Sequence, residues 1–252
     1  MKFKISCVIP THNRRTLALR AIKSVLDTRY SNLEIIIIDD ASMPEFILPR
    51  DMVNIPQIKV IRLLEPSGGA VARNAGVCSS TGDLICFLDD DDELLPNKFD
   101  LMSIPFLTDS KIDAVVAECR IIDLKSESEL DCNNPHFSRL NNTIKNKIHT
   151  NATLIKRSVF NTIEFNEKLQ KFQDTQFNTD LCFLFNVVHF NTPVAKWYTN
   201  HGGGQITTRK ALLFSSRNYF LLLTHFILKT RIPIYLLYEH LMRLFYLLLR
   251  LK

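Results

Sequence analysis

The sequence predicts an α/β fold in which a mostly parallel sheet is flanked by helices and followed by a C-terminal helical appendage. Short apolar segments alternate with segments of helical periodicity over residues 1–107. Strands that are joined by helices pair in parallel through right-handed crossovers. The 252 residues, 46% hydrophobic and 23% charged, are enough for one large α/β domain, or for a domain with an appendage.

Four buried strands are expected in the first half, and the second, EIIIIDD, is rich in β-branched residues. Helices are expected over residues 11–29, where apolar side chains recur on one face, and over 70–80, after a glycine pair. The strands are expected at 5–10, 34–40, 58–64 and 84–89.

After residue 107 the pattern is less regular. The segment AVVAECRIID predicts a strand at 114–123, and the polar stretch that follows predicts a mobile loop over 124–150. Ordered structure is expected to resume in three segments, of which the second is a helix and the third a strand with a glycine-rich turn: 152–160, 171–185 and 192–209.

Polar side chains follow three of the predicted strands at the point where each strand ends. Ligands of open parallel sheets bind beyond the carboxyl ends of the strands, so these side chains converge on one edge. Each cluster alone is compatible with a solvated loop, but the three together indicate a site. The clusters are Pro10 to Asn13, Asp39-Asp40, and Asp89 to Asp92.

The stretch FLDDDDELLP places four aspartates directly after an apolar run. Neighbouring carboxylates repel by about 3 kcal/mol at ~5 Å and an effective dielectric near 20. A divalent cation offsets that repulsion, and hard oxygen ligands suit Mg²⁺ or Mn²⁺. Asp89 and Asp91 would share a face if the segment is extended. The alternative is an exposed acidic turn at the start of a helix.

Three more side chains are candidates by type and position. Arg73, in the helix after the glycine pair, suits a hydrogen bond to a nucleotide, although a surface arginine is the alternative. Asp174, flanked by aromatic residues, suits a general base, with Asp180 as a weaker competitor and a helix N-cap as the alternative. His201 lies beside three glycines and suits a contact to phosphate or metal, or a hinge loop.

Cysteine and glycine usage bounds the class of protein. Six cysteines without a CxxC pair favour buried reduced thiols over disulfides or a zinc site. Seven glycines are too few for nucleotide sites that are built from glycine-rich loops. The N-terminus leads directly into a strand without a hydrophobic signal region, so we expect a cytoplasmic protein.

The tail over residues 211–252 is rich in Leu, Phe and Tyr but has no run of ~18 uninterrupted apolar residues. From Arg209 onward there are eight basic residues and one acidic residue, whereas the remainder has a net charge of −2. This combination predicts helices, divided at Pro233, that lie in the interface of the inner face of the cytoplasmic membrane. The alternative is packing on the domain or a homodimer contact.

Six segments, in this order and spacing, resemble the inverting GT-A glycosyltransferases of family 2, including their DXD motif: SCVIPTHNR, EIIIIDDAS, GGAVARNAGV, GDLICFLDDDDELLP, LIKRSVF and FQDTQF. The resemblance runs from about residue 4 to about residue 209. It implies a Rossmann-like GT-A domain over 1–209, with a nucleotide-binding half (1–107) and an acceptor-binding half (108–209). Residues 210–252 would form the helical C-terminal region.

The resemblance also implies roles for the residues that match the motifs of the family. Pro10 and Thr11 would line the base pocket. Asp40 would accept the N3–H of a uracil, with Asp39 as the less favoured partner. Arg73 would contact the base or the ribose.

The acidic run would hold the metal in such an enzyme. Asp89 and Asp90 would approach the ribose and the metal. Asp91 would be the principal ligand of Mn²⁺ or Mg²⁺, together with Asp89.

In the same family pattern, Asp174 would be the catalytic base, and His201 and Gln205 would belong to a segment that closes over the diphosphate. The sequence departs from the pattern at two positions. His12 stands where tyrosine or phenylalanine is usual, which affects packing against the base. Gln173 stands where many members have glutamate, which leaves the aspartate with less support for its orientation.

The implied activity is inverting sugar transfer from a nucleotide sugar, a uridine diphosphate sugar above all, to a glycan or lipid-linked glycan in lipopolysaccharide, capsule or O-antigen synthesis. No nucleic-acid partner is expected. One alternative is a sugar-1-phosphate nucleotidyltransferase, which would need a glycine-rich basic loop that PTHNRRT lacks. The other is a non-catalytic, membrane-associated scaffold on the same fold.

Overall fold

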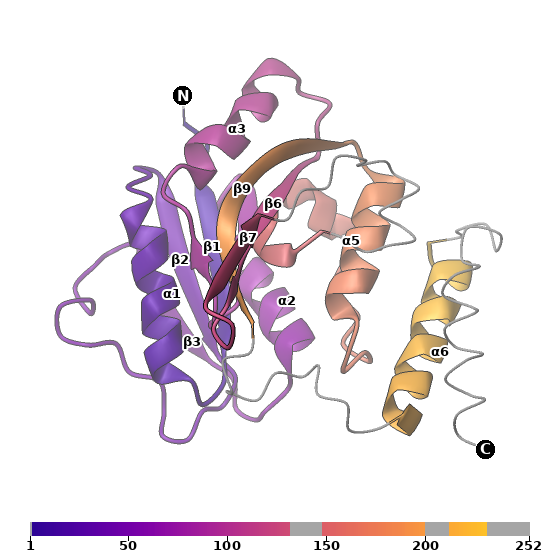
Figure 1. Cartoon of the computed structure of the whole chain (residues 1–252), viewed down its shortest axis with the longest axis horizontal. Coiled ribbons are helices and arrows are strands. Elements are labelled where there is room, and N and C mark those ends of the chain that lie inside the picture. The colour runs from indigo at the N-terminus through magenta and orange to yellow at the C-terminus, as the bar shows by residue number, and fades with distance from the viewer. Residues whose placement is uncertain (1, 132–147, 200–211, 231–252) are drawn as a thin grey trace.

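A computed structural model of the chain describes residues 2–131, 148–199 and 212–230. In these residues nine strands form one sheet in the order β3-β2-β1-β4-β8-β6-β9-β5, with β7 paired to β6 (Figure 1). Helices cover both faces of the sheet, so the α/β architecture expected from the alternating pattern is confirmed.

The first half of the sheet is parallel throughout. It consists of β1 (Ile5–Thr11), β2 (Leu33–Asp39), β3 (Ile58–Arg62) and β4 (Leu84–Phe87), each within two residues of its expected bounds. β1 pairs with both β2 and β4, and the register aligns Thr11 with Asp39 and Val8 with Phe87. The central strands are mostly apolar because helices cover both faces.

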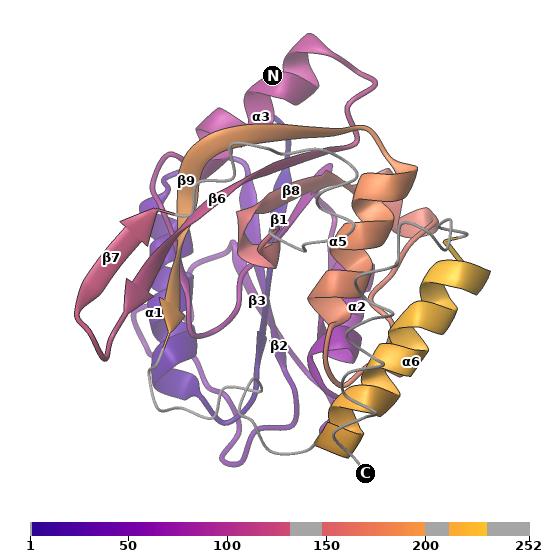
Figure 2. The ribbon, with the colours of Figure 1, turned by 45° about the vertical axis from the view of Figure 1, so that its right-hand side comes forward.

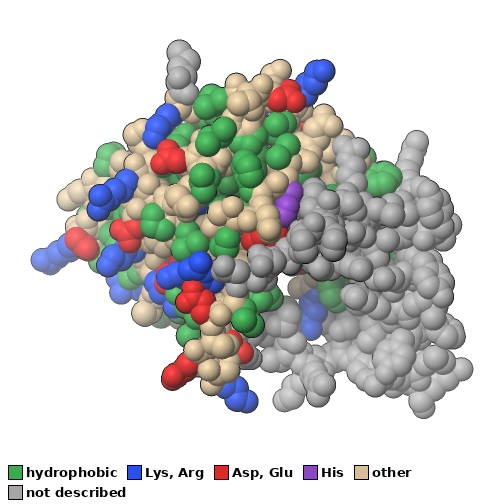
Figure 3. Space-filling model, turned by 45° about the horizontal axis from the view of Figure 1, so that its top comes forward, with side chains coloured by type: hydrophobic (Ala, Val, Ile, Leu, Met, Phe, Trp, Pro, Cys, Tyr) green, Lys and Arg blue, Asp and Glu red, His purple; other side chains and the backbone are tan. Residues whose placement is uncertain are grey.

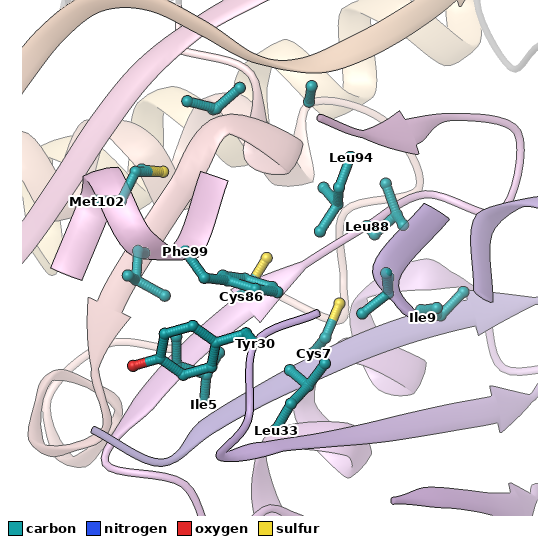
Figure 4. Packing of buried hydrophobic residues seen from close by; sticks show 14 of the residues in the cluster. Ile5, Cys7, Ile9, Tyr30, Leu33, Cys86, Leu88, Leu94, Phe99 and Met102 are labelled. Carbon is teal, nitrogen blue, oxygen red and sulfur yellow. The ribbon is translucent and has the colours of Figure 1, made fainter. Parts of the chain in front are cut away.

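Two apolar cores lie on opposite faces of the sheet. The first packs β1 against α1 (Arg15–Asp27) and α3 (Lys98–Thr108), and it includes an edge-to-face contact between Tyr30 and Phe99 with ring centroids 5.7 Å apart (Figure 4). The second packs the sheet against α2 (Gly69–Ser79) and α5 (Gln173–Leu184). Cys7 and Cys86 are fully buried in strands, as expected, whereas Cys78 is exposed.

The second half of the sheet is mixed. The strand expected at 114–123 is β6 (Ala114–Asp123); it pairs in parallel with β9 (Val187–Thr199) and antiparallel with β8 (Thr153–Lys156). Three features differ from expectation. β9 begins five residues earlier than the expected strand, and the expected loop after β6 contains β7 (Ser128–Asp131). The short strand β5 (Glu93–Leu94) pairs antiparallel with β9.

Short 3₁₀ segments flank β8 on both sides. They are η1 (Thr150–Ala152) and η2 (Arg157–Asn161), so the ordered segment expected at 152–160 is a short strand between two turns. The helix expected at 171–185 is α5.

The beginning of the tail packs on the domain. α6 (Leu212–Leu228) lies alongside α5, and Leu222, Leu223 and Phe226 bury Leu169 (Figure 2). This arrangement is the packing alternative for that part of the tail. Within the described residues no helix combines the length and the apolar character that crossing a membrane requires. His201, Gln205 and the tail after residue 230 lie outside the described residues, so the membrane-interface interpretation stays a prediction.

Charged side chains are mixed on the described surface. Acidic and basic groups are interspersed on the face shown in Figure 3. Exposed pairs such as Lys2–Asp100, at 3.1 Å, are part of this pattern. Such exposed pairs contribute little to the free energy of unfolding. The charged groups at the edge of the sheet differ from them because they are largely buried.

Candidate active site

The polar clusters at the ends of β1, β2 and β4 meet, as the parallel topology predicts. Thr11 Oγ1 donates a hydrogen bond to Asp90 Oδ2 at 2.8 Å, and the main-chain N–H of Asp40 donates to the Thr11 carbonyl at 2.9 Å. Pro10 precedes them and is half-buried. Residues from three strand ends therefore share one hydrogen-bonded edge.

Asp39 organises the loop after β2. Its fully buried carboxylate accepts the main-chain N–H groups of Ser42 at 3.0 Å and Phe46 at 3.2 Å, and it pairs with Arg62. Burial opposes ionisation, but the hydrogen bonds from Ser42 and Phe46 and the arginine outweigh it and lower the pKa of Asp39. This side chain is committed to the fold and has no exposed surface for a ligand.

Asp40 holds the turn that precedes α2. Its two carboxylate oxygens accept the main-chain N–H groups of Ser67 at 2.7 Å and Gly68 at 2.8 Å. Gly68 has φ +90°, a conformation that glycine adopts without strain. Asp40 retains 7% of its surface, against none for Asp39, so it is the more accessible of the two.

Two arginines offset the crowded charge of the acidic run. Arg73 pairs with Asp89. Arg14 Nη1 lies 3.1 Å from Asp90 Oδ1 and 2.9 Å from Asp91 Oδ2, so one guanidinium bridges two aspartates. The repulsion that the sequence implies is therefore reduced by the fold itself at three of the four positions.

The fourth aspartate, Asp92, is buried among hydrogen-bond donors. Asn151 Nδ2 donates to one oxygen, and the main-chain N–H of Tyr198 donates to the other at 2.8 Å. Asn151 also accepts the main-chain N–H of Asp89 at 2.9 Å, and its carbonyl accepts a hydrogen bond from the fully buried Lys98. Asn151 thus fixes Asp89 and Asp92 relative to each other.

The pKa values of Asp89, Asp90 and Asp92 are shifted in different directions or to different extents. Burial and the neighbouring aspartates raise the pKa of Asp92 to about 9. Burial also raises the pKa of Asp90 to about 6, against the opposing effect of Arg14. At Asp89 burial is outweighed, chiefly by Arg73, and the pKa is lowered. A bound divalent cation would favour the charged form of every one of these groups.

One group of side chains has the composition of a cation site. Ligand atoms of Asp89, Asp92 and His149 all lie within 4.8 Å of one another. His149 Nδ1 is buried and has no hydrogen-bond partner in the described part of the chain, and the ring packs on Trp197 with centroids 4.7 Å apart. Burial lowers the pKa of His149 and favours the neutral imidazole that a metal binds. The donor set therefore fits a divalent cation.

The structure brings Asp89 into this group, but it places Asp91 in the ion pair with Arg14. The assignment of Asp91 as the principal metal ligand stays a prediction. Asp92 and His149 are functional candidates that sequence reasoning missed. Asp92 belongs to the conspicuous acidic run, whereas His149 follows a polar loop where no local spacing marks it.

Arg73 links the acidic run to the start of α5. Besides pairing with Asp89, its Nη1 lies 3.4 Å from Gln173 Oε1, and its guanidinium lies over the ring of Phe165 at 5.4 Å. Gln173 Nε2 in turn donates to the Leu169 carbonyl at 2.7 Å. Both the oxygen and the nitrogen of the Gln173 side-chain amide therefore have hydrogen-bond partners. Gln173 is the residue that stands where many members of the family have glutamate.

Asp174 is exposed in the first turn of α5. Its Oδ1 accepts the main-chain N–H of Thr175 at 2.7 Å, and its charge acts on His149. The competing candidate Asp180 is buried and faces α6, with its Oδ2 2.6 Å from His225 Nε2. Of the two, Asp174 is the carboxylate that lies close to the acidic group.

Comparison with known proteins identifies the family. The model described as "Glycosyl transferase family 2" matches residues 6–192. The chain is 32% identical over 223 residues to WcaA of Escherichia coli K12, a glycosyl transferase that its name assigns provisionally to colanic acid biosynthesis; the match covers 81% of this chain and 75% of WcaA. An uncharacterized glycosyltransferase of Haemophilus influenzae is 36% identical over 94 residues, 37% of this chain and 31% of that protein.

Solved structures share the fold. TarS of Staphylococcus aureus (residues 1–349), in complex with UDP-GlcNAc, superposes with a TM-score of 0.72 at 16% identity, over 91% of this chain and 67% of that one. Its complex with UDP superposes with a TM-score of 0.68 at 16% identity, over 91% and 66% of the two chains. The chain has the GT-A fold and belongs to glycosyl transferase family 2.

Proposed function

We propose that this protein is an inverting, metal-dependent glycosyltransferase that moves a sugar from a uridine diphosphate donor to a saccharide or lipid-linked acceptor in surface-polysaccharide synthesis. The observation that carries the proposal is the meeting of Asp89, Asp92 and His149 with the start of α5 at the carboxyl edge of the sheet. Support comes from the UDP-GlcNAc and UDP complexes of TarS and from the name of WcaA.

The donor would lie over the ends of β1 and β2. Pro10 and Thr11 would line the base pocket. Each carboxylate oxygen of Asp40 accepts one main-chain N–H and retains a second lone pair, which suits the N3–H of uracil. Arg73, already paired with Asp89, would reach the base or the ribose from α2. The closing roles of His201 and Gln205 remain predictions.

Asp89, Asp92 and His149 would hold the divalent cation, with Asp91 as a further candidate. Carboxylates suit both Mg²⁺ and Mn²⁺, whereas an imidazole nitrogen is typical of transition-metal sites, so this donor set favours Mn²⁺. When bound, the ion would supply Lewis-acid stabilisation of the diphosphate leaving group. Arg14 would partly offset the charge of Asp90 and Asp91 beside it.

Asp174 would act as the general base. Its carboxylate is exposed, so an acceptor hydroxyl can approach within hydrogen-bonding distance. Asp174 would take the hydroxyl proton while the acceptor oxygen bonds to C1 of the sugar from the face opposite the leaving group, and the C1–O bond to the diphosphate would break in the same step. An α-linked donor would then yield a β-glycoside.

The test begins with a panel of nucleotide sugars and measures thermal stabilisation of the full chain with Mn²⁺ and with chelator. The donor identified in this way is used to compare wild type with Asp174→Asn. We expect transfer to fall by at least a hundredfold while donor binding is retained. Asp51→Asn, an exposed acid outside the site, is the matched control and should transfer at the wild-type rate. Stabilisation by no nucleotide sugar, or full transfer by Asp174→Asn, contradicts the proposal.

A further inference from the structure

We infer that Asn218 of α6 is a positioning residue that fixes the turn from which Asp174 is presented. The inference rests on the proposed function, because Asp174 is the proposed base. It assigns to the beginning of the C-terminal region a task in catalysis that is separate from any contact with a membrane or an acceptor.

The turn before α5 has an unusual backbone. Phe172, the residue that precedes the helix, has φ 66° and ψ 22°, in the left-handed region. A bulky residue rarely adopts this conformation, and it persists only where the surroundings hold it. Gln173 and Asp174 follow directly, so the direction in which they project depends on this turn.

Asn218 contributes two hydrogen bonds that hold the turn. Its Oδ1 accepts the main-chain N–H of Gln170 at 3.0 Å and of Lys171 at 3.2 Å. An amide oxygen has two lone pairs, so this atom can satisfy both donors at once. Only 3% of Asn218 is exposed, so water does not readily replace it.

Apolar contacts from the same helix hold the turn on either side of these hydrogen bonds. Leu169 is buried against Leu222 and Leu223 of α6, and Phe172 packs on this cluster. The residues before and after the two hydrogen-bonded amides are thus both anchored on α6. A change in the position of α6 would therefore alter the conformation of the turn.

The turn is also connected to the acidic group. The Leu169 carbonyl accepts a hydrogen bond from Gln173 Nε2, and Gln173 Oε1 faces Arg73, which pairs with Asp89. The segment that Asn218 holds therefore orients Gln173 together with Asp174. One contact from α6 reaches both the proposed base and the arginine of the metal-binding side.

A second contact fixes α6 itself along α5. The buried carboxylate of Asp180 accepts a hydrogen bond from Gln176 Nε2 at 2.6 Å and another from Thr230. It also lies 2.6 Å from His225 Nε2 of α6. α6 runs beside α5 in both ribbon views. The position of α6, and with it that of Asn218, is therefore also fixed by the contacts of Asp180 with His225 and Thr230.

The test compares Asn218→Ala with Asn218→Asp in the full chain, using the donor that the panel identifies. Asn218→Ala removes the acceptor of two main-chain donors, and we expect kcat to fall by about tenfold to a hundredfold, since small misplacements of a catalytic group have effects of this size. The KM for the donor should change by less than kcat does, because most of the proposed donor pocket lies at the ends of β1 and β2 and only Arg73 connects it to the turn. Asn218→Asp retains an oxygen acceptor and should recover most of kcat.

Thr224→Ala is the matched control. Thr224 lies on the same helix, and its hydroxyl bonds the Leu221 carbonyl within α6 at 2.8 Å. We expect wild-type kcat from it. A kcat for Asn218→Ala within twofold of wild type, or an Asn218→Asp variant as impaired as Asn218→Ala, overturns the inference.

Hydrogen exchange supplies a readout that does not depend on activity. The amides of Gln170 and Lys171 should be protected in wild type and in Asn218→Asp, and should exchange faster in Asn218→Ala, with the C-terminal half of α5 unchanged. Rapid exchange of both amides in wild type overturns the inference even if Asn218→Ala does not fold. If Asp174→Asn retains transfer, the proposed function fails; if Asp174→Asn is inactive and Asn218→Ala is not impaired, only this inference fails.

Discussion

Arg14 Nη1 lies 2.9 Å from Asp91 Oδ2, so a cation of the protein occupies the aspartate that sequence resemblance favours as the metal ligand. The same nitrogen reaches Asp90 at 3.1 Å. The acidic run is thereby divided. Asp90 and Asp91 share the single positive charge of Arg14 in the loop after β1, and Asp89 and Asp92 lie beside His149.

This division predicts opposite effects of Arg14→Gln with and without metal. Without metal, loss of the bridge removes the positive charge that Asp90 and Asp91 share, and the free energy of unfolding should fall by about 1–3 kcal/mol. With Mn²⁺, the stabilisation that the ion provides should increase, because the site has become more negative. Urea unfolding in chelator and in Mn²⁺ measures both quantities.

Arg15→Gln is the control for that experiment. Arg15 is the exposed neighbour, and its Nε bonds the Ile47 carbonyl at 3.0 Å rather than an aspartate of the run. It should leave the effect of Mn²⁺ unchanged. An Arg14→Gln variant whose stabilisation by Mn²⁺ equals or falls below that of wild type would show that the bridge has no influence on the cation site.

Asn151 should control metal affinity without binding the metal. The side-chain oxygen of Asn151 accepts the main-chain N–H of Asp89, and its side-chain N–H donates to the carboxylate of Asp92. Mutation of a residue that hydrogen-bonds to the ligands of a metal typically lowers metal affinity by about 10–100-fold. We therefore expect Asn151→Ala to weaken Mn²⁺ binding by that factor. It should also lower the free energy of unfolding by about 1–3 kcal/mol, because buried polar groups lose their partner.

Calorimetric titration with Mn²⁺ on folded protein checks the effect of Asn151→Ala. Asn161→Ala, an exposed asparagine at the end of the turn after β8, is the control and should bind as wild type does. Equal affinity of Asn151→Ala and Asn161→Ala would refute the role of Asn151.

Gly76 should be intolerant of a side chain. A Cβ at this position would meet Val8 Cγ1 at 2.2 Å, because α2 crosses β1 closely here. Gly76→Ala should therefore destabilise the protein by about 1–3 kcal/mol through overpacking, even though alanine favours a helix. Denaturant unfolding measures this loss. The double variant Gly76→Ala/Val8→Ala should recover part of it, and a Gly76→Ala protein as stable as wild type would contradict the packing described.

The first half of the fold could be predicted because its signals are local. β1, β2 and β4 are mostly apolar segments, which is the pattern expected of strands that are covered on both faces. β5 and β7 are different. They contain two and four residues, and they are strands because β9 and β6 offer them partners. α3 contains Pro105, a residue type that the interior of a helix disfavours, and no helix is expected there from the sequence alone.

The site divides in the same way. The convergence of Thr11, Asp40 and Asp90 follows from parallel strand order, which the sequence makes visible. The selection of Asp92 over Asp91 for the group around His149 depends on where Arg14 and Asn151 lie, and these contacts join segments far apart in the chain. Asn218 likewise acts across the helix pair. Such partners are set by tertiary packing, and no local spacing encodes them.

The central claim is that Asp89, Asp92 and His149 hold a divalent cation for a nucleotide-sugar donor. Pulsed electron paramagnetic resonance of the protein loaded with Mn²⁺ and UDP tests it most directly, because a bound imidazole couples its nitrogen to the metal. We predict a nitrogen coupling in wild type that disappears in His149→Ala. A wild-type spectrum without nitrogen coupling, or one identical in His149→Ala, would contradict the claim.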